Sequence, residues 1–219
     1  MAKTIEIRDT FGNLLFAYAC EENTIKKTVE KAIYQNVSLC NANLCGVNLC
    51  YVDLSNANLY GANLCDADLG NANLFNANLV NANLNDTKLD NANLRNANLF
   101  NADLNDTNLY GANLFNANLR NANLDSVDLR NANLYLANLS NANLYLANLK
   151  SSNLNYANFS NANLNGANLC HTNSCYANFS NANLDDAYLC DTNSCYSNFR
   201  NTNLSCTDLT NAILRGAKK

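Results

Sequence analysis

Apolar side chains recur at every fifth residue along most of this sequence. From residue 37 the chain reads VSLCN, ANLCG, VNLCY, VDLSN and onward to AILRG at 212–216, which makes 36 consecutive pentads with centres from Leu39 to Leu214. The centre is Leu in 31 pentads, and the residue two places before it is always Ala, Val, Thr or Ser. The residue directly before the centre is Asn or Asp in all but four pentads. One repeating region therefore follows a different N-terminal segment.

A period of five fits neither a helix nor a flat strand. On an α-helix successive centres would lie about 140° apart and form no apolar stripe. On a strand an odd period would send alternate centres to opposite faces. A chain that turns a corner in every pentad places all the centres inside, and its coils then stack through parallel backbone hydrogen bonds about 4.8 Å apart. Asn beside the centre is expected to tolerate the turn and to hydrogen-bond the backbone or the Asn stacked on it.

The departures from the consensus give the size of one coil. They recur at a spacing of 20 residues, in Phe159, Phe179 and Phe199, in Tyr156, Tyr176 and Tyr196, and in the interior pair Ser174 and Ser194. Twenty residues are four pentads, so the coil is predicted to be a square with residues i and i+20 in contact. The 36 pentads make about nine coils, or a rod about 43 Å long. The two Ser residues compensate for the volume of the Phe centres that follow them, or they line an internal ligand pocket.

The tandem motif A-(N/D)-L-x-x resembles that of the pentapeptide-repeat family, over about 180 of the 219 residues. The resemblance implies an all-β solenoid, a right-handed quadrilateral β-helix with small residues and Leu or Phe inside. The square coil follows from the period; the handedness is what the resemblance adds.

Residues 1–36 are expected to form a cap, and residues 37–219 the β-helix. Two short strands, 4–8 and 14–20, flank a turn at Gly12-Asn13, and residues 22–36 (ENTIKKTVEKAIYQN) predict a short helix that begins near Asn23 or Thr24. This hairpin and helix would cover the open end of the first coil, as solenoids require. The C-terminal sequence NAILRGAKK predicts no comparable cap. Leu209, Ile213 and Leu214 are therefore the candidate surface for a dimer joined end to end.

Composition and charge restrict the kinds of partner and the cellular location that we expect. The net charge of −4 argues against direct binding of nucleic acid through a basic surface. No apolar run approaches the 18 residues of a membrane span, and the N-terminus lacks the pattern of a signal peptide. We expect a cytoplasmic protein with no membrane contact, whose ten Cys residues are free thiols. The alternative is that stacked outward pairs, including Cys45 with Cys65, form disulfides on oxidation, since their Cα spacing is within disulfide range.

Candidate chemistry is concentrated at residues 170–195, where Cys170, His171 and Cys175 are followed by Cys190 and Cys195. The spacing resembles that of a zinc site. The repeat places the two Cys stacks on adjacent sides of the square, however, so their thiolates are not expected to converge on one ion. His171 is the only His and has no identifiable catalytic partner. We expect no metal, no cofactor, no catalytic residues and no enzymatic activity.

The outward positions define two candidate interaction surfaces. The acidic face carries Asp66, Asp68, Asp86, Asp106, Asp125, Asp128, Asp185 and Asp186, with Lys88 among them. The aromatic face carries Tyr135, Tyr156, Tyr176 and Tyr196, together with Phe75, Phe115 and Leu136. Both patterns are also typical of surfaces without a partner: the acidic face as a solvated surface, and the aromatic face as stacked pairs that stabilise the coils. Contiguous exposed aromatic residues also mark interaction surfaces.

These features favour a non-enzymatic interaction or scaffold protein whose protein partner the sequence does not identify. The alternative comes from the family resemblance, because some bacterial members imitate DNA electrostatically and bind DNA gyrase. This chain departs from those members in its Leu centres, its uninterrupted coils and its modest charge. The resemblance also implies a homodimer joined through the C-terminal coils. A side-by-side dimer through the aromatic face and a monomer are the other two states.

Overall fold

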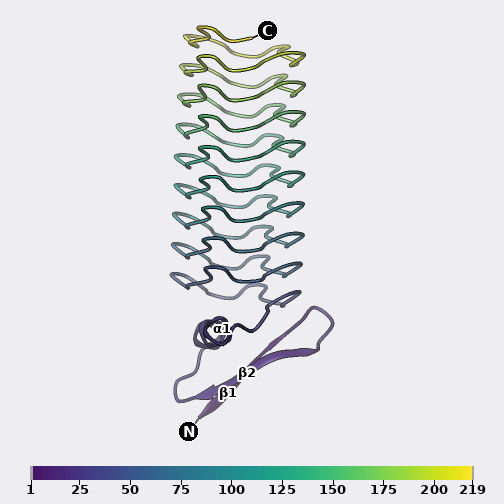
Figure 1. Ribbon diagram of the computed structural model, residues 1–219, viewed down its shortest axis with the longest axis vertical. Helices are drawn as coiled ribbons and strands as arrows, with labels where there is room; N and C mark the ends of the chain where they lie inside the picture. The colour runs from purple at the N-terminus through teal and green to yellow at the C-terminus, as the bar shows by residue number, and fades with distance from the viewer. Residues whose placement is uncertain (1, 219) are drawn as a thin grey trace.

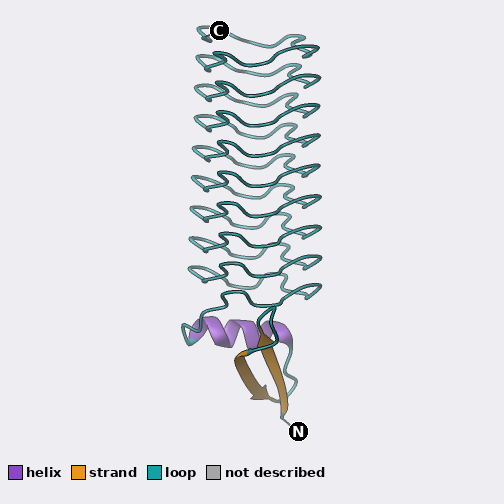
Figure 2. Cartoon of the chain, turned by 90° about the vertical axis from the view of Figure 1, so that its right-hand side faces the viewer, coloured by secondary structure: helices purple, strands orange, loops and turns teal. Residues whose placement is uncertain are grey.

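The computed structural model describes residues 2–218, which form an N-terminal hairpin and helix followed by a long stack of coils (Figure 1). Strands β1 (Lys3–Arg8) and β2 (Leu14–Cys20) pair antiparallel around the predicted turn. Helix α1 spans Ile25–Tyr34. Thr24 is its N-cap, and the Thr24 side chain accepts a hydrogen bond from the backbone N–H of Lys27. Figure 2 shows α1 lying crosswise between the hairpin and the first coil.

Each coil takes 20 residues, as the sequence predicts. Parallel bridges join each residue before a centre to its equivalent one coil on, from Asn43 with Asn63 to Asn198 with Lys218. The backbone bonds alternate: Leu44 donates to the oxygen of Asn63 over 2.7 Å, and Asn63 donates to the oxygen of Ala42 over 2.9 Å. This is the ladder of a parallel sheet, restricted to a short stretch on each side of the square.

The corners are four-residue turns that begin at each centre. In the first of them Ala42 donates to the oxygen of Leu39, and Asn41, the third residue, has a φ of 57°. Left-handed values recur two residues after almost every centre, where Asn, Asp and Gly predominate because they tolerate that conformation best. The sequence predicts that the Asn before the centre adopts the backbone conformation of the turn. The structure places the turn geometry on the residue two places after the centre instead.

The Asn before the centre makes ladders along the outside of the rod, which confirms its predicted hydrogen bonding. Asn83 donates from Nδ2 to Oδ1 of Asn63 over 3.1 Å, and Asn63 donates to Asn43 over 3.2 Å. The same Oδ1 of Asn63 accepts the backbone N–H of Cys65. Each amide side chain thus joins one coil to the next and also holds its own turn.

The interior is a continuous column of apolar side chains. Leu centres such as Leu114 are fully buried, and the Ala residues two places before them are at most a few per cent exposed. Phe159, Phe179 and Phe199 stack at centroid distances of 5.1 and 5.0 Å. Ser174 and Ser194 are buried beside this stack, and their hydroxyl oxygens lie 2.7 Å apart. They hydrogen-bond to each other inside the rod, and their small volume offsets that of the rings.

The N-terminal unit contacts the first coil through both its elements. Asn43, which has no earlier coil to pair with, donates to the backbone oxygen of Arg8 over 2.8 Å. Val29 and Ala32 of α1 are fully buried in the same apolar cluster as the first centres. Lys26 donates from Nζ to the backbone oxygen of Cys50 over 2.6 Å. Within the described residues, no helix has the length and apolar character to span a membrane.

Candidate interaction surfaces and cysteine pairs

The aromatic face forms one stacked column. Phe115 and Tyr135 stack at a centroid distance of 5.7 Å, Tyr135 meets the edge of Tyr156 at 5.5 Å, and Tyr156, Tyr176 and Tyr196 stack at 4.9 and 5.2 Å. Tyr176 is half exposed. The ring faces are largely covered by one another, so the ring edges and the phenolic hydroxyls face outward.

Both ends of the aromatic column are closed by neighbouring residues. The guanidinium of Arg95 lies over the Phe115 ring, 5.3 Å from its centroid. At the other end the Tyr196 ring lies so close to Gly216 that a Cβ there would meet a ring carbon at 2.6 Å. Desolvation, together with the neighbouring Tyr156 and Tyr196, raises the pKa of Tyr176. The Tyr176 phenol therefore keeps its proton at physiological pH, and the column offers apolar ring edges with hydroxyl groups.

The acidic face is divided along the rod. Asp66, Asp86 and Asp106 are exposed and stack at successive corners on one edge. The next three positions on that edge are Ser126, Leu146 and Gly166, and Asp186 follows. The remaining predicted members, Asp68, Asp125, Asp128 and Asp185, are half-buried. The structure thus brings together three exposed carboxylates near the N-terminal half and separates them from the pair Asp185 and Asp186.

Two of the half-buried carboxylates have partners. Arg130, which the sequence places on the neighbouring face, forms an ion pair with Asp128 at 2.7 Å and lies over the Tyr110 ring. Burial acts to raise the pKa of Asp128, but the hydrogen bonds and charge of Arg130 bring it below its ordinary value. The Cys50 thiol donates to Asp68 over 2.7 Å and lowers the pKa of that carboxyl. Arg130 therefore adds a positive charge to the acidic face, where the sequence predicts Lys88.

The C-terminal coil leaves its interior uncovered within residues 2–218. Leu204, Leu209 and Leu214 are partly exposed and line a shallow hollow together with Phe199. Ile213 lies at the rim with 53% of its surface exposed. The apolar end predicted from the sequence is thus present as a continuous surface.

The expectation that all cysteines are free thiols is wrong for two stacked pairs. Cys45 is bonded to Cys65, and Cys170 to Cys190, with Cα–Cα distances of 4.8 and 4.6 Å. Neighbouring coils hold the two Cα atoms within the range that a disulfide spans, so the bond needs no movement of the backbone. Cys170 is also buried, although the repeat predicts an outward position. The burial of Cys170 depends on its local packing and does not follow from its position in the repeat alone.

The third stacked pair, Cys175 and Cys195, is free. The Cys175 thiol donates to the backbone oxygen of Asn193, at a sulfur–oxygen distance of 3.7 Å. Desolvation and the adjacent Cys195 raise the pKa of Cys175. Cys175 therefore keeps its proton at neutral pH.

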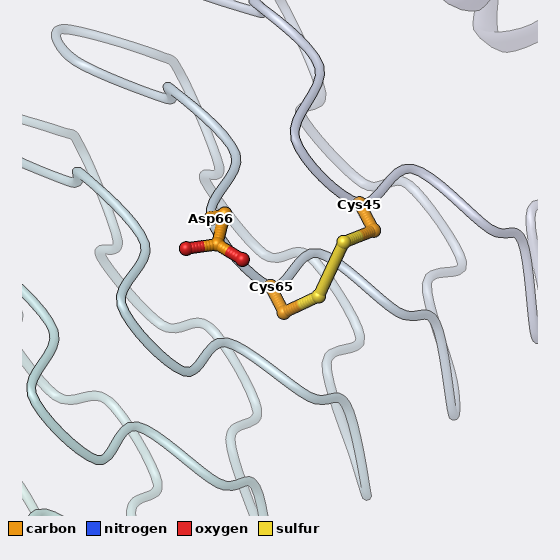
Figure 3. Close-up of side chains that lie close together, drawn as sticks. All are labelled: Cys45, Cys65 and Asp66. Carbon is orange, nitrogen blue, oxygen red and sulfur yellow. A yellow bond between two sulfur atoms is a disulfide. The ribbon is translucent and has the colours of Figure 1, made fainter.

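The described residues hold two groups of converging ligand atoms, and neither contains Cys170, His171, Cys175, Cys190 or Cys195. His171 faces Asp191 at 3.8 Å and joins no such group in the described chain. Cys45, Cys65 and Asp66 have ligand atoms within 4.8 Å of one another. Figure 3 draws these three side chains together. Asp185, Asp186 and Cys206 form a second, exposed group. Sequence reasoning missed the first group, although the signal was present in two Cys at the i, i+20 spacing followed directly by an Asp.

The repeat matches the model of a known protein family. The family model described as "Pentapeptide repeats" matches in eight copies between residues 35 and 216. Such repeats form right-handed quadrilateral β-helices. Among curated proteins, none matches the sequence significantly.

Several solved structures are similar to this chain. HetL from the cyanobacterium Nostoc sp. strain PCC 7120, a pentapeptide repeat protein involved in heterocyst differentiation regulation, is 30% identical, with 88% of this chain and 93% of that one covered and a TM-score of 0.32. Full-length QnrB1, a plasmid-mediated fluoroquinolone resistance protein, is 18% identical, with 80% and 90% covered and a TM-score of 0.52.

Proposed function

Because this chain belongs to the pentapeptide-repeat family, we propose that it is a non-enzymatic rod that binds a protein partner through its outer surface. The aromatic column from Phe115 to Tyr196 is the observation that supports this most directly. It offers a row of ring edges and hydroxyls on a face held rigid by the coils. Tyr is among the residues enriched at protein interfaces because it combines an apolar body with a polar tip.

The filled interior supports the same proposal. Mainly Leu and Ala side chains, with some Phe, Val, Thr and Ser, fill the rod, and the interior hydroxyls of Ser174 and Ser194 bond to each other. A partner therefore contacts the outside of the rod. The hairpin and α1 cover the first coil, so the sides and the C-terminal end are the surfaces available.

A capture experiment tests the aromatic column. Wild-type protein, Tyr176→Asp and the control Asn101→Asp are immobilised, and the proteins retained from the source cells are identified by mass spectrometry. Both substitutions add one negative charge at an exposed position on different sides of the rod. We expect at least one protein to bind the wild type and the control but to lose about tenfold of its binding to Tyr176→Asp, since central aromatic residues contribute about 2 kcal/mol or more. Equal retention by all three proteins would contradict the proposal.

A second candidate function is inhibition or protection of DNA gyrase through imitation of DNA, and the stack of Asp66, Asp86 and Asp106 favours it. Ser126, Leu146 and Gly166 interrupt the row, and this weighs against an extended imitation of a phosphate backbone. In a gyrase supercoiling assay, the scaffold proposal predicts no effect at a large excess of the protein. Inhibition that is weakened by Asp66→Asn, Asp86→Asn and Asp106→Asn together would favour the gyrase function.

A further inference from the structure

Two sulfur atoms and a carboxylate meet on the outside of the first two coils. Cys45 and Cys65 are stacked 20 residues apart, and Asp66 follows Cys65 at the left-handed corner position with a φ of 56°. The two sulfurs and a carboxylate oxygen all lie within 4.8 Å of one another. Figure 3 shows the Asp66 side chain extending from the same corner as the Cys65 sulfur. Cys45 and Asp66 are exposed, so solvent reaches the group.

The stack leaves open space on one side of this group. The residue one coil before Asp66 is Gly46, and a Cβ at Gly46 would meet nothing within 4 Å. The other glycines at this kind of corner, Gly61, Gly111, Gly166 and Gly216, are each covered by the side chain stacked on them. In those four stacks the side chain of the preceding coil covers the corner that follows it, whereas Gly46 has no side chain to cover the corner of Asp66.

An oxygen without a partner belongs to the residue that follows Cys65 in the same stack. Asn85 is one coil after Cys65, and its backbone oxygen accepts the N–H of Asp66 over 2.9 Å. Its side-chain oxygen, Oδ1, is buried and accepts no hydrogen bond from the described residues. Buried polar oxygens are normally satisfied, so an oxygen in this state indicates a water or an ion as its partner.

We infer that Cys45, Cys65 and Asp66 form, in the reduced protein, a binding site for a thiophilic divalent cation of the zinc class. Two thiolates and a carboxylate are ligands that Zn²⁺ takes in a tetrahedral arrangement, which leaves a fourth position for water or an amide oxygen. Both cysteines bind the cation as thiolates, so binding releases the two thiol protons.

The same sulfurs make the site dependent on redox state. A low-molecular-weight disulfide, such as oxidised glutathione, takes two electrons and two protons from the Cys45 and Cys65 thiols and becomes two thiols. The protein then holds the Cys45–Cys65 bond, and its sulfurs are no longer thiolates. The oxidised and metal-bound forms therefore exclude each other.

The Cys170–Cys190 pair provides a matched control within the chain. It has the same spacing of 20 residues and a similar Cα–Cα distance. Its flanking residues, His171 and Asp191, face each other and do not join the sulfurs in a converging group among residues 2–218. A cation that recognises only a stacked pair of thiols would bind at both places, whereas the proposed site requires Asp66 as well.

The test is a titration of the reduced full-length protein with Co²⁺ and then Zn²⁺. The visible absorption of tetrahedral thiolate-bound Co²⁺ reports the site, and Zn²⁺ displaces it. We expect one equivalent to bind to the wild type and to Cys190→Ser, no binding to Cys65→Ser, and binding about tenfold weaker or worse to Asp66→Asn. Asp66 is exposed, so its substitution does not disturb folding, and Asp86→Asn is its control. Protein oxidised with glutathione disulfide should bind no cation.

Several results would overturn the inference. They are the absence of binding to the reduced wild type, unchanged binding to Cys65→Ser or Asp66→Asn, equal losses in Cys65→Ser and Cys190→Ser, and equal binding to the oxidised protein. Circular dichroism of each variant shows that the rod is folded in the titration.

Discussion

At the scale of single residues, the pentads differ in which residue occupies the left-handed corner two places after the centre. Asn, Asp and Gly occupy most of these corners, but Tyr51 is there with a φ of 58° and a side chain that is 71% exposed. A non-Gly residue in the left-handed region costs about 1 kcal/mol or more, and Asn least among them. The next corner on the same edge is Asn71.

Replacing Tyr51 with Asn is expected to stabilise the rod. The change relieves backbone strain and puts an amide in line with Asn71, so the free energy of unfolding should rise by about 0.5–1 kcal/mol. Tyr51→Val is the control and should lower it, because β-branched residues tolerate a positive φ poorly. Urea unfolding followed by circular dichroism measures both. If the Asn variant is less stable than the Val variant, the corner strain does not govern this position.

At the scale of the pentad, the buried centre and the exposed corner differ in how well they tolerate a charged side chain. Leu114 is fully buried between the centres of neighbouring coils, whereas Asn116 of the same corner is exposed and donates to Asn96 over 3.0 Å. A charge at the centre would be buried without a partner. A charge at the corner stays in water.

The substitution Leu114→Asp is expected to prevent folding or to destabilise the rod by several kcal/mol. Asn116→Asp adds the same group two residues later and loses one exposed hydrogen bond, which costs about 1 kcal/mol. Soluble expression and thermal denaturation compare the two. A soluble, fully folded Leu114→Asp protein with the stability of Asn116→Asp would refute the interior assignment.

At the scale of the whole molecule, the two ends of the rod differ. The hairpin and α1 bury Val29 and Ala32 against the first coil, while Leu209 and Leu214 at the other end are partly exposed. Pairing of two such ends around a two-fold axis would cover both apolar surfaces, and two-fold symmetry is the commonest in homo-oligomers. The aromatic column supplies the competing, side-by-side contact.

Small-angle scattering with light scattering distinguishes the three states. We expect a particle of twice the mass with nearly twice the longest dimension, which Leu209→Asp returns to a single rod and Tyr176→Asp leaves unchanged. A thicker particle of unchanged length that responds only to Tyr176→Asp would show side-by-side pairing. A single rod at high concentration would exclude both dimers.

The sequence by itself determined the square coil, the identity of the interior side chains, the 20-residue contacts and the presence of a hairpin and a helix before them. The first three follow from periodicity, because a fixed period leaves one register in which every Leu is inside, whereas the hairpin and helix follow from turn and capping residues in the N-terminal segment. The tertiary structure decided which corner residue takes the left-handed conformation, which stacked cysteines are bonded, and that Arg130 reaches Asp128. It also decided that Asp66 joins Cys45 and Cys65, whereas His171 turns to Asp191. A repeat places Cα atoms, but the direction of each side chain depends on its neighbours across the corner and in the next coil.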